Sequence, residues 1–234
     1  MDHLNDTELL RSVRGEYHFS FEGGTIDPFW STFINGGPPG ANFAALTTDE
    51  AYDGVQSVML SATGSPPLPV AGIEHSFSSP QQGTFSAFIF ATPGSTTWMG
   101  ISTNDSVSPF CSGSCLETGY QQYPLQNQPA VWDSTAGYVA EQGYSAYGWH
   151  ELTFSVGDGG STVDWDGTQI YAALGLANFT TVDFYAQGGG VAYVDDVTLN
   201  TSDAGAAPEP GTLSGIVVAV CVCFVWRRGM SRKG

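Results

Sequence analysis

Alternating apolar and polar positions recur through most of the chain, and they predict β-strands. Residues 17–22 place their three aromatic side chains on one face and polar side chains on the other. Residues 151–156 alternate in the same way, so Leu152, Phe154 and Val156 are expected to point inward. No segment before the C-terminal tail shows a helical period, which favours an all-β protein.

Further strands are predicted where apolar runs are bounded by turn residues. Residues 84–90 are apolar on both faces, as in a central strand between packed layers. Asp166-Gly167 separates two short strands and predicts a tight hairpin turn. The remaining candidates are residues 57–61, 97–101, 181–186 and 191–199, with a glycine turn at 188–190. Many short strands with regular turns are typical of an antiparallel β-sandwich, here expected over residues 16–200.

One long stretch, residues 104–147, shows no clear strand pattern and is expected to be an irregular loop. Loops of this length in a compact domain are usually functional or disordered. Aromatic rings stack on the apolar faces of sugars. The candidate ligand-binding residues are Trp132, Tyr138, Tyr144 and Tyr147. The alternative is that these rings only cover an edge of the sandwich.

The C-terminal tail has three parts in a fixed order. They are the tripeptide Pro208, Glu209 and Pro210, an apolar run over residues 211–226, and a basic end that begins with Arg227 and Arg228. The order predicts a linker (201–210), a transmembrane anchor (211–228) and a basic cytoplasmic tail (229–234). At about 1.5 Å per residue the apolar run spans about 24 Å, against a hydrocarbon core of about 30 Å. A temporary anchor is therefore an alternative to a permanent one.

This tail resembles the PEP-CTERM sorting signal of Gram-negative bacteria. The resemblance implies export, recognition by an exosortase, cleavage near the tripeptide, and display in the cell envelope or extracellular matrix. The N-terminus does not fit this expectation, because residues 1–17 carry several charges and no apolar run. A misassigned start would explain this, and residues 1–15 would then be disordered or spurious. The alternatives are that the chain is a fragment or that the tail is not used as a signal.

The charge distribution is strongly one-sided. The formal net charge is -17, and no Lys or Arg occurs between Arg14 and Arg227. This argues against nucleic-acid binding, which needs Lys and Arg to neutralise phosphates. Any buried carboxylate in the body must find hydrogen-bond donors or a metal ion instead of a salt bridge with Lys or Arg.

The two ends of the body carry short motifs that resemble carbohydrate-binding modules and other concanavalin-like or jelly-roll sandwiches. These are Phe21-Glu22-Gly23 and the aromatic-x-Asp-Asp-Val-x-Leu pattern of residues 193–199. The resemblance implies neighbouring first and last strands joined by a structural calcium ion at Glu22, Asp195 and Asp196. Simple alternation places Asp195 with the core-facing residues of its strand. The alternative is that backbone N–H donors satisfy it. Residues 149–154 and the Asp166-Gly167 turn are also similar to laminin-G-like sandwiches.

Two smaller features complete the candidates. Cys111 and Cys115 are close in sequence and predict a local disulfide in an oxidising compartment. Asp158, Asp164 and Asp166 lack the spacing of a calcium loop and are better explained as turn residues.

Nothing in the chain predicts catalysis: no His lies in a nucleophile motif, and the Glu-x-Asp-x-x-Glu strand of many sandwich glycosidases is absent. The sequence therefore predicts an exported, non-catalytic protein of the cell surface or matrix that binds glycan, such as an extracellular polysaccharide. The alternatives are a purely structural surface protein and a glycan hydrolase.

Overall fold

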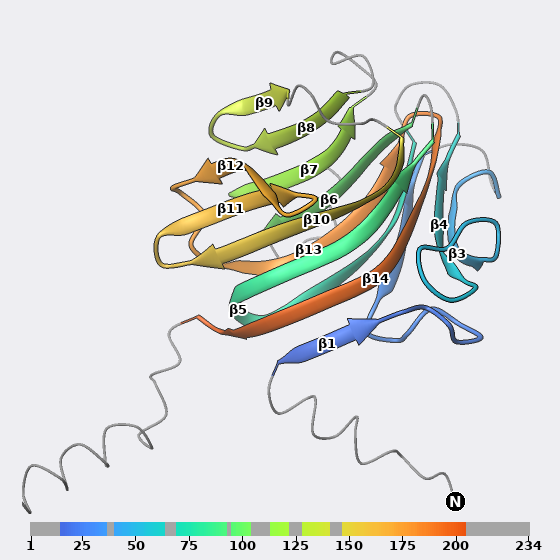
Figure 1. Ribbon diagram of the computed structural model, residues 1–234, viewed down its shortest axis with the longest axis horizontal. Helices are drawn as coiled ribbons and strands as arrows, with labels where there is room; N and C mark the ends of the chain where they lie inside the picture. Colours follow the sequence, from blue (N-terminus) through green and yellow to red (C-terminus); the bar gives the residue numbers. More distant parts are fainter. Residues whose placement is uncertain are drawn as a thin grey trace, which may run out of the picture. The chain divides into compact units, whose positions relative to one another are not determined.

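The computed structural model describes residues 15–36, 40–63, 69–92, 95–103, 113–121, 128–140 and 147–204, and within these ranges the regular structure is all β (Figure 1). The chain divides into two units, Met1–Ala204 and Gly205–Gly234, and the described residues belong to the first. No helix within the described ranges is both long and apolar enough to span a lipid bilayer. The predicted sorting tail, from Pro208 to the basic end, lies outside these residues, as does the N-terminal segment before Gly15.

The described residues form fourteen strands. They are β1 (Glu16–Phe19), β2 (Ser31–Asn35), β3 (Phe43–Thr47), β4 (Ser57–Ala62), β5 (Val70–Ala91), β6 (Thr96–Ser102), β7 (Cys115–Gln121), β8 (Gln128–Asp133), β9 (Gly137–Ala140), β10 (Gly148–Gly157), β11 (Gly160–Trp165), β12 (Thr168–Ala173), β13 (Phe179–Gln187) and β14 (Gly190–Asp203). Every recorded pairing between them is antiparallel.

The strands form two layers that share the long strand β5 (Figure 1). The second half of β5 pairs with β10 and β14, in a layer that also contains β1, β3, β4, β11 and β12 and is called sheet I here. The first half of β5 pairs with β2 and β13, and that layer continues through β6, β7, β8 and β9 as sheet II.

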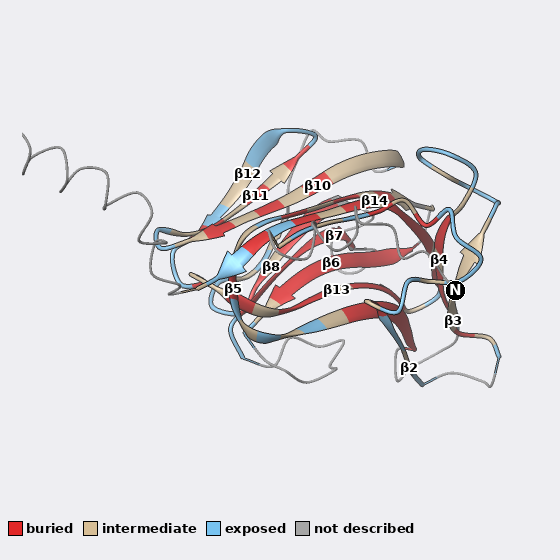
Figure 2. Ribbon diagram, turned by 90° about the horizontal axis from the view of Figure 1, so that it is seen from below, coloured by how far each residue is buried: buried red, intermediate tan, exposed pale blue. Residues whose placement is uncertain are grey.

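The main core lies between the two sheets, and alternation selects its residues. In sheet I it contains Phe85 and Phe154, and in sheet II it contains Met99 and Phe184. Buried positions in red follow both layers in Figure 2. A second, smaller cluster includes Trp98, Ala130 and Tyr185, which alternate with these core residues. Sheet II is therefore apolar on part of its outer face as well.

Local sequence signals predicted several elements correctly. Leu152, Phe154 and Val156 all point into the core. The Asp166-Gly167 turn joins β11 and β12, and both residues have positive φ, as a tight hairpin turn of this kind requires. The all-β antiparallel sandwich is thus confirmed.

The interpretation of residues 104–147 as one irregular loop is wrong. It contains β7, β8 and β9, which extend sheet II by three strands. These strands are short, and Gly119 and Pro129 interrupt their pattern, so neither the hydrophobic period nor the β-propensity stands out. Long-range pairing with β6 decides their conformation.

The predicted orientation of Asp195 is also wrong. The pairing of β14 with β5 shifts between Asp195 and Thr198, and Asp196 has a φ of 50°. This bulge reverses the alternation, so Val197 faces the core, whereas Asp195 lies opposite Phe88 on the outer face of sheet I. β14 then continues to Asp203, into the segment expected to be linker.

Candidate functional site

A row of three carboxyl groups, one glycine and two aromatic rings crosses the outer face of sheet II. Cross-strand pairing aligns Glu74 with Asp183, Asp183 with Gly100 and Gly100 with Glu117. The alignment continues from Glu117 to Trp132 and from Trp132 to Tyr138. We call these six residues the carboxyl–aromatic row. At about 4.8 Å between strands it spans about 24 Å, which is long enough to contact an oligosaccharide.

Alternation places the row on the face opposite the main core. On β13 the core-facing residues are Val182 and Phe184, so Asp183 points outward between them. On β7 the core contains Leu116 and Tyr120, and Glu117 points outward. The three carboxyl groups thus come from three strands, β5, β13 and β7, that are distant in sequence.

Gly100 leaves space for two of these carboxyl groups to approach each other. A Cβ atom built on Gly100 would lie 2.5 Å from Asp183 Oδ1 and 3.3 Å from Glu117 Cγ. Both side chains therefore lean over the glycine from opposite neighbouring strands. Any larger residue at this position would push at least one of them away.

The carboxyl groups are mostly hidden from solvent, which changes their protonation. Burial raises the pKa of Glu117 well above its usual range, and the charge of Asp183 adds to the rise, whereas a hydrogen bond with the Tyr185 side chain opposes it. Burial, followed by the charge of Glu74, raises the pKa of Asp183 to about 7. Burial also raises the pKa of Glu74. All three shifts disfavour the ionised forms, so the three carboxyl groups resist carrying three full charges at once.

One atom of the row stands out because it is buried without a partner. Asp183 Oδ1 has no hydrogen-bond partner among the residues that the structure describes. Buried polar atoms are nearly always paired, and an exception in a folded protein calls for an explanation. This oxygen and the Glu117 side chain both lie against the position that a Cβ of Gly100 would occupy, at 2.5 Å and 3.3 Å from it.

The other end of the row is aromatic and reaches the surface. Trp132 and Tyr138 have ring centroids 4.4 Å apart at a tilt of 54°, and Tyr138 also lies 6.1 Å from Trp98. Tyr138 is 48% exposed, whereas Trp98 is almost fully buried beneath it. The row therefore changes from buried carboxyl groups to an accessible aromatic pair.

The predicted aromatic site is divided by the structure. Trp132 and Tyr138 are brought together, but they lie on strands β8 and β9 and not on a loop. Tyr147 is 49% exposed and immediately precedes β10, which belongs to sheet I. Tyr144 lies outside the described residues.

The predicted calcium ligands lie near one another at the bulge of β14, but protein groups occupy their oxygens. Asp195 is completely buried, and its Oδ2 accepts hydrogen bonds from the backbone N–H groups of Tyr52 (2.9 Å) and Asp53 (3.2 Å). Its Oδ1 accepts a bond of 2.8 Å from the N–H of Asp196. The Asp196 side chain in turn pairs with His18 Nε2.

Glu22, like Asp195, accepts hydrogen bonds from backbone N–H groups of the loop that contains Tyr52 and Asp53. Its Oε1 accepts hydrogen bonds from the N–H groups of Val55 (2.8 Å) and Gln56 (3.0 Å). Among the described residues no group of three or more His, Cys, Asp or Glu side chains is arranged to hold a metal ion. In this structure the loop of residues 52–56 is held by hydrogen bonds from its backbone N–H groups to Asp195 and Glu22. Calcium at Glu22, Asp195 and Asp196 stays a prediction.

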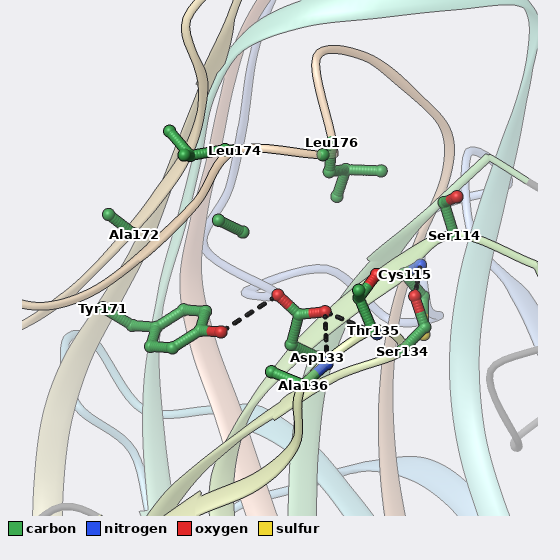
Figure 3. A pocket seen from close by; sticks show the side chains of 12 residues that line it. Ser114, Cys115, Asp133, Ser134, Thr135, Ala136, Tyr171, Ala172, Leu174 and Leu176 are labelled. Carbon is green, nitrogen blue, oxygen red and sulfur yellow. Dashed lines mark hydrogen bonds between the residues drawn. The ribbon is translucent and has the colours of Figure 1, made fainter.

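A separate cavity of about 290 Å³ lies where β8 and β12 approach at one end of the sandwich (Figure 3). Asp133 Oδ2 accepts a hydrogen bond of 3.0 Å from the Tyr171 hydroxyl, and Asp133 Oδ1 accepts bonds from the N–H groups of Thr135 and Ala136. Burial, and then Asp133, raises the pKa of Tyr171. The polar groups that these bonds join are paired within the protein, so the cavity offers less to a ligand than the carboxyl–aromatic row does.

Cys115 borders the same cavity and is disulfide-bonded. Its partner lies outside the described residues, and so does Cys111. The predicted bond between Cys111 and Cys115 therefore stays a prediction.

Comparison with known proteins identifies the fold but no family. No family model matches the chain, and no curated protein matches it. A GH16 protein of Bacteroides ovatus mixed-linkage glucan utilisation, in complex with a product, superposes with a TM-score of 0.53 at 15% identity over 78% of this chain and 99% of that one. The β-glucanase of Bacillus licheniformis matches with a TM-score of 0.53 at 12% identity, covering 80% and 98%.

A further similar structure is a Bacillus subtilis protein of unknown function with a galectin-like fold, at a TM-score of 0.51 and 12% identity over 80% and 96% of the two chains. This chain has a concanavalin-like fold. The similar structures include hydrolases and a protein without assigned function, and at such identities the likeness shows the fold alone.

Sequence reasoning missed Glu74, Asp183 and Glu117, because a pattern search examines one strand at a time. Each acid follows a core residue in its strand, and Asp183 has one on both sides, Val182 and Phe184. An acid inside such an apolar strand was the available signal. Its significance depends on the strand pairing, which the sequence does not reveal.

Proposed function

We propose that this protein binds a glycan along the carboxyl–aromatic row. The observation that carries the proposal is the alignment, across neighbouring strands of sheet II, of an aromatic pair with three carboxyl groups. Aromatic rings cover the apolar C–H faces of sugars, and carboxyl groups form paired hydrogen bonds with sugar hydroxyls.

Trp132 and Tyr138 would supply the stacking surface. Their rings are tilted toward each other at 54°, so they offer two differently oriented faces to successive sugar units. Glu117 is the residue next to Trp132 in the row. Its carboxyl group would form hydrogen bonds with the hydroxyl groups of a sugar ring stacked on Trp132. The strands hold both residues, and a site on paired strands is more rigid than one on a loop.

The cellular setting in this proposal is export. The tail signal at Pro208, Glu209 and Pro210 supports sorting by an exosortase and display in the envelope or matrix of a Gram-negative bacterium. The absence of Lys and Arg from the body argues against a role in nucleic-acid binding. In this setting the protein is a non-catalytic glycan-binding protein of the cell surface.

The proposal is tested by binding the full chain to a panel of polysaccharides, followed by titration calorimetry with the best ligand. Trp132→Ala should weaken binding at least tenfold, since it removes the ring that lies between Glu117 and Tyr138 in the row. Trp149→Ala is the matched control, because Trp149 packs against Phe90 on the outer face of sheet I. Equal losses in both variants, or no loss in Trp132→Ala, would contradict the proposed site.

A second candidate function is glycoside hydrolysis, and the carboxyl pair at Gly100 favours it. Glycosidases use two carboxyl groups, one protonated as an acid and one ionised as a base or nucleophile. Burial raises the pKa of Asp183 to about 7, as suits a protonated acid, and Glu117 provides a second carboxyl group on the other side of Gly100. The one-strand acidic motif was absent from the sequence, but acids from three strands can meet the same need.

Hydrolysis is tested by measuring reducing ends released from the bound polysaccharide. Release by the natural protein that Glu117→Gln abolishes, while binding persists, would establish an enzyme. Binding without release over many hours would support the non-catalytic role.

A further inference from the structure

The carboxyl pair at Gly100 has no cationic partner within the body of the protein. No Lys or Arg occurs between Arg14 and Arg227, so neither described strands nor the loops between them can supply one. Two carboxyl groups this close repel each other when both ionise, and burial strengthens the repulsion. A positive charge from outside the body would relieve it.

The histidines of the body are engaged elsewhere. His18 pairs with Asp196, and His150 Nδ1 bonds to Asp166 Oδ2 at 2.7 Å. His75 follows Glu74 in β5 and therefore points to the other face, where its Nδ1 donates to the backbone carbonyl of Phe29 at 2.7 Å. None of the three reaches the row.

The geometry at Gly100 suits a compact donor. Asp183 Oδ1 is buried and unpaired, and it projects over a residue without a side chain. The described residues contain no group of three acidic, His or Cys side chains arranged for a metal ion. An ammonium group needs fewer ligands than a metal ion, since its three N–H bonds can be shared among two carboxyl groups and a sugar or water oxygen.

Aromatic rings begin at the next position of the row. Trp132 is paired with Glu117 and Tyr138 with Trp132, so a ligand that reaches Gly100 can also lie on aromatic faces. Such faces attract cations as well as the C–H faces of sugars. The ligand therefore combines a positive charge with a sugar ring.

We propose that the glycan carries free amino groups, as in a de-N-acetylated hexosamine polymer, and that one ammonium binds to the carboxyl groups of Asp183 and Glu117, the two side chains that lean over Gly100. This inference rests on the proposed glycan binding at the same row. It names a substrate class, cationic amino sugars, which the sequence did not predict.

Three β-1,4-linked hexamers test it, because they differ only at carbon 2: cellohexaose with a hydroxyl, the N-acetylglucosamine hexamer with an acetamide, and the glucosamine hexamer with an ammonium. Binding of each to the full chain is measured by calorimetry at pH 6.5 and moderate salt. We expect the glucosamine hexamer to bind at least tenfold more tightly than the other two.

The charge of the whole protein requires a matched control, because a net charge of -17 attracts any cation. Asp183→Asn removes an ionisable carboxyl group at the site, and Asp49→Asn removes one at an exposed position in the loop between β3 and β4. The preference for the glucosamine hexamer should fall to about threefold or less in Asp183→Asn and persist in Asp49→Asn. Thermal melting of both variants checks that they remain folded.

The outcomes separate the two proposals. Equal binding of the three hexamers overturns the amino-sugar inference and leaves glycan binding in place. An equal reduction by both variants also overturns it, because the attraction would then be general. If no hexamer binds, the inference fails, and the polysaccharide panel with Trp132→Ala decides the proposed function separately.

Discussion

Replacing Asp183 by Asn should stabilise the protein at alkaline pH. The carboxyl group is buried beside two other acids, and burial raises its pKa from 3.8 to about 7. It therefore binds a proton more tightly in the folded than in the unfolded state. The contribution of protonated Asp183 to stability is fully present below about pH 4 and is lost as the pH rises through about 7. The neutral amide of Asn cannot ionise and avoids this loss.

The size of the effect follows from the two pKa values. They differ by about three pH units, and each unit corresponds to about 1.36 kcal/mol. Ionised Asp183 thus costs the folded state as much as about 4 kcal/mol above pH 7. Removing its charge also relieves Glu117, whose pKa the Asp183 charge raises, so the two effects act in the same direction.

The assay is urea denaturation of the natural protein, Asp183→Asn and Asp49→Asn at pH values between 4 and 8.5. The free energy of unfolding of Asp183→Asn should equal that of the natural protein near pH 4. At pH 8 the free energy of unfolding of Asp183→Asn should exceed that of the natural protein by a few kcal/mol, which corresponds to a rise of many degrees in Tm. Asp49 is exposed, so Asp49→Asn tests the general effect of one lost charge.

A constant difference between Asp183→Asn and the natural protein at all pH values would refute the reasoning. It would mean that Asp183 is either ionised in both states or never ionises in this range. A destabilised variant at pH 8 would refute it as well, because the charge would then be stabilised by a group that the described residues do not show.

Three further predictions follow from other contacts. Gly100→Ala should reduce glycan binding at least tenfold, because the new Cβ would lie 2.5 Å from Asp183 Oδ1, whereas Gly24→Ala, with nothing within 4 Å, should leave calorimetric binding unchanged. Asp195→Ala should lower the free energy of unfolding in urea by about 3 kcal/mol, since several backbone N–H groups lose their acceptor; a loss below about 1 kcal/mol would show that water replaces it. A chelator should lower the Tm if calcium is held at Glu22 and Asp195, and leave it unchanged if the N–H donors suffice.

The sequence by itself determined the all-β class and the alternation of several core strands. Alternation in residues 151–156, the apolar segment 84–90 and the Asp166-Gly167 turn are local signals, and each was confirmed because side chains in a strand alternate whatever the partner strand. The sequence also determined the charge pattern: a body without Lys or Arg is a fact that no folding can change.

Only the tertiary structure decided which residues meet. Pairing through β13 and β6 aligns Glu74, Asp183 and Glu117, which are far apart in the chain, and no local period records that alignment. The bulge at Asp196 reversed the expected direction of Asp195 for the same reason, since one extra residue shifts every later side chain to the other face. Register is a long-range property, so the candidate site became visible only when the strands were paired.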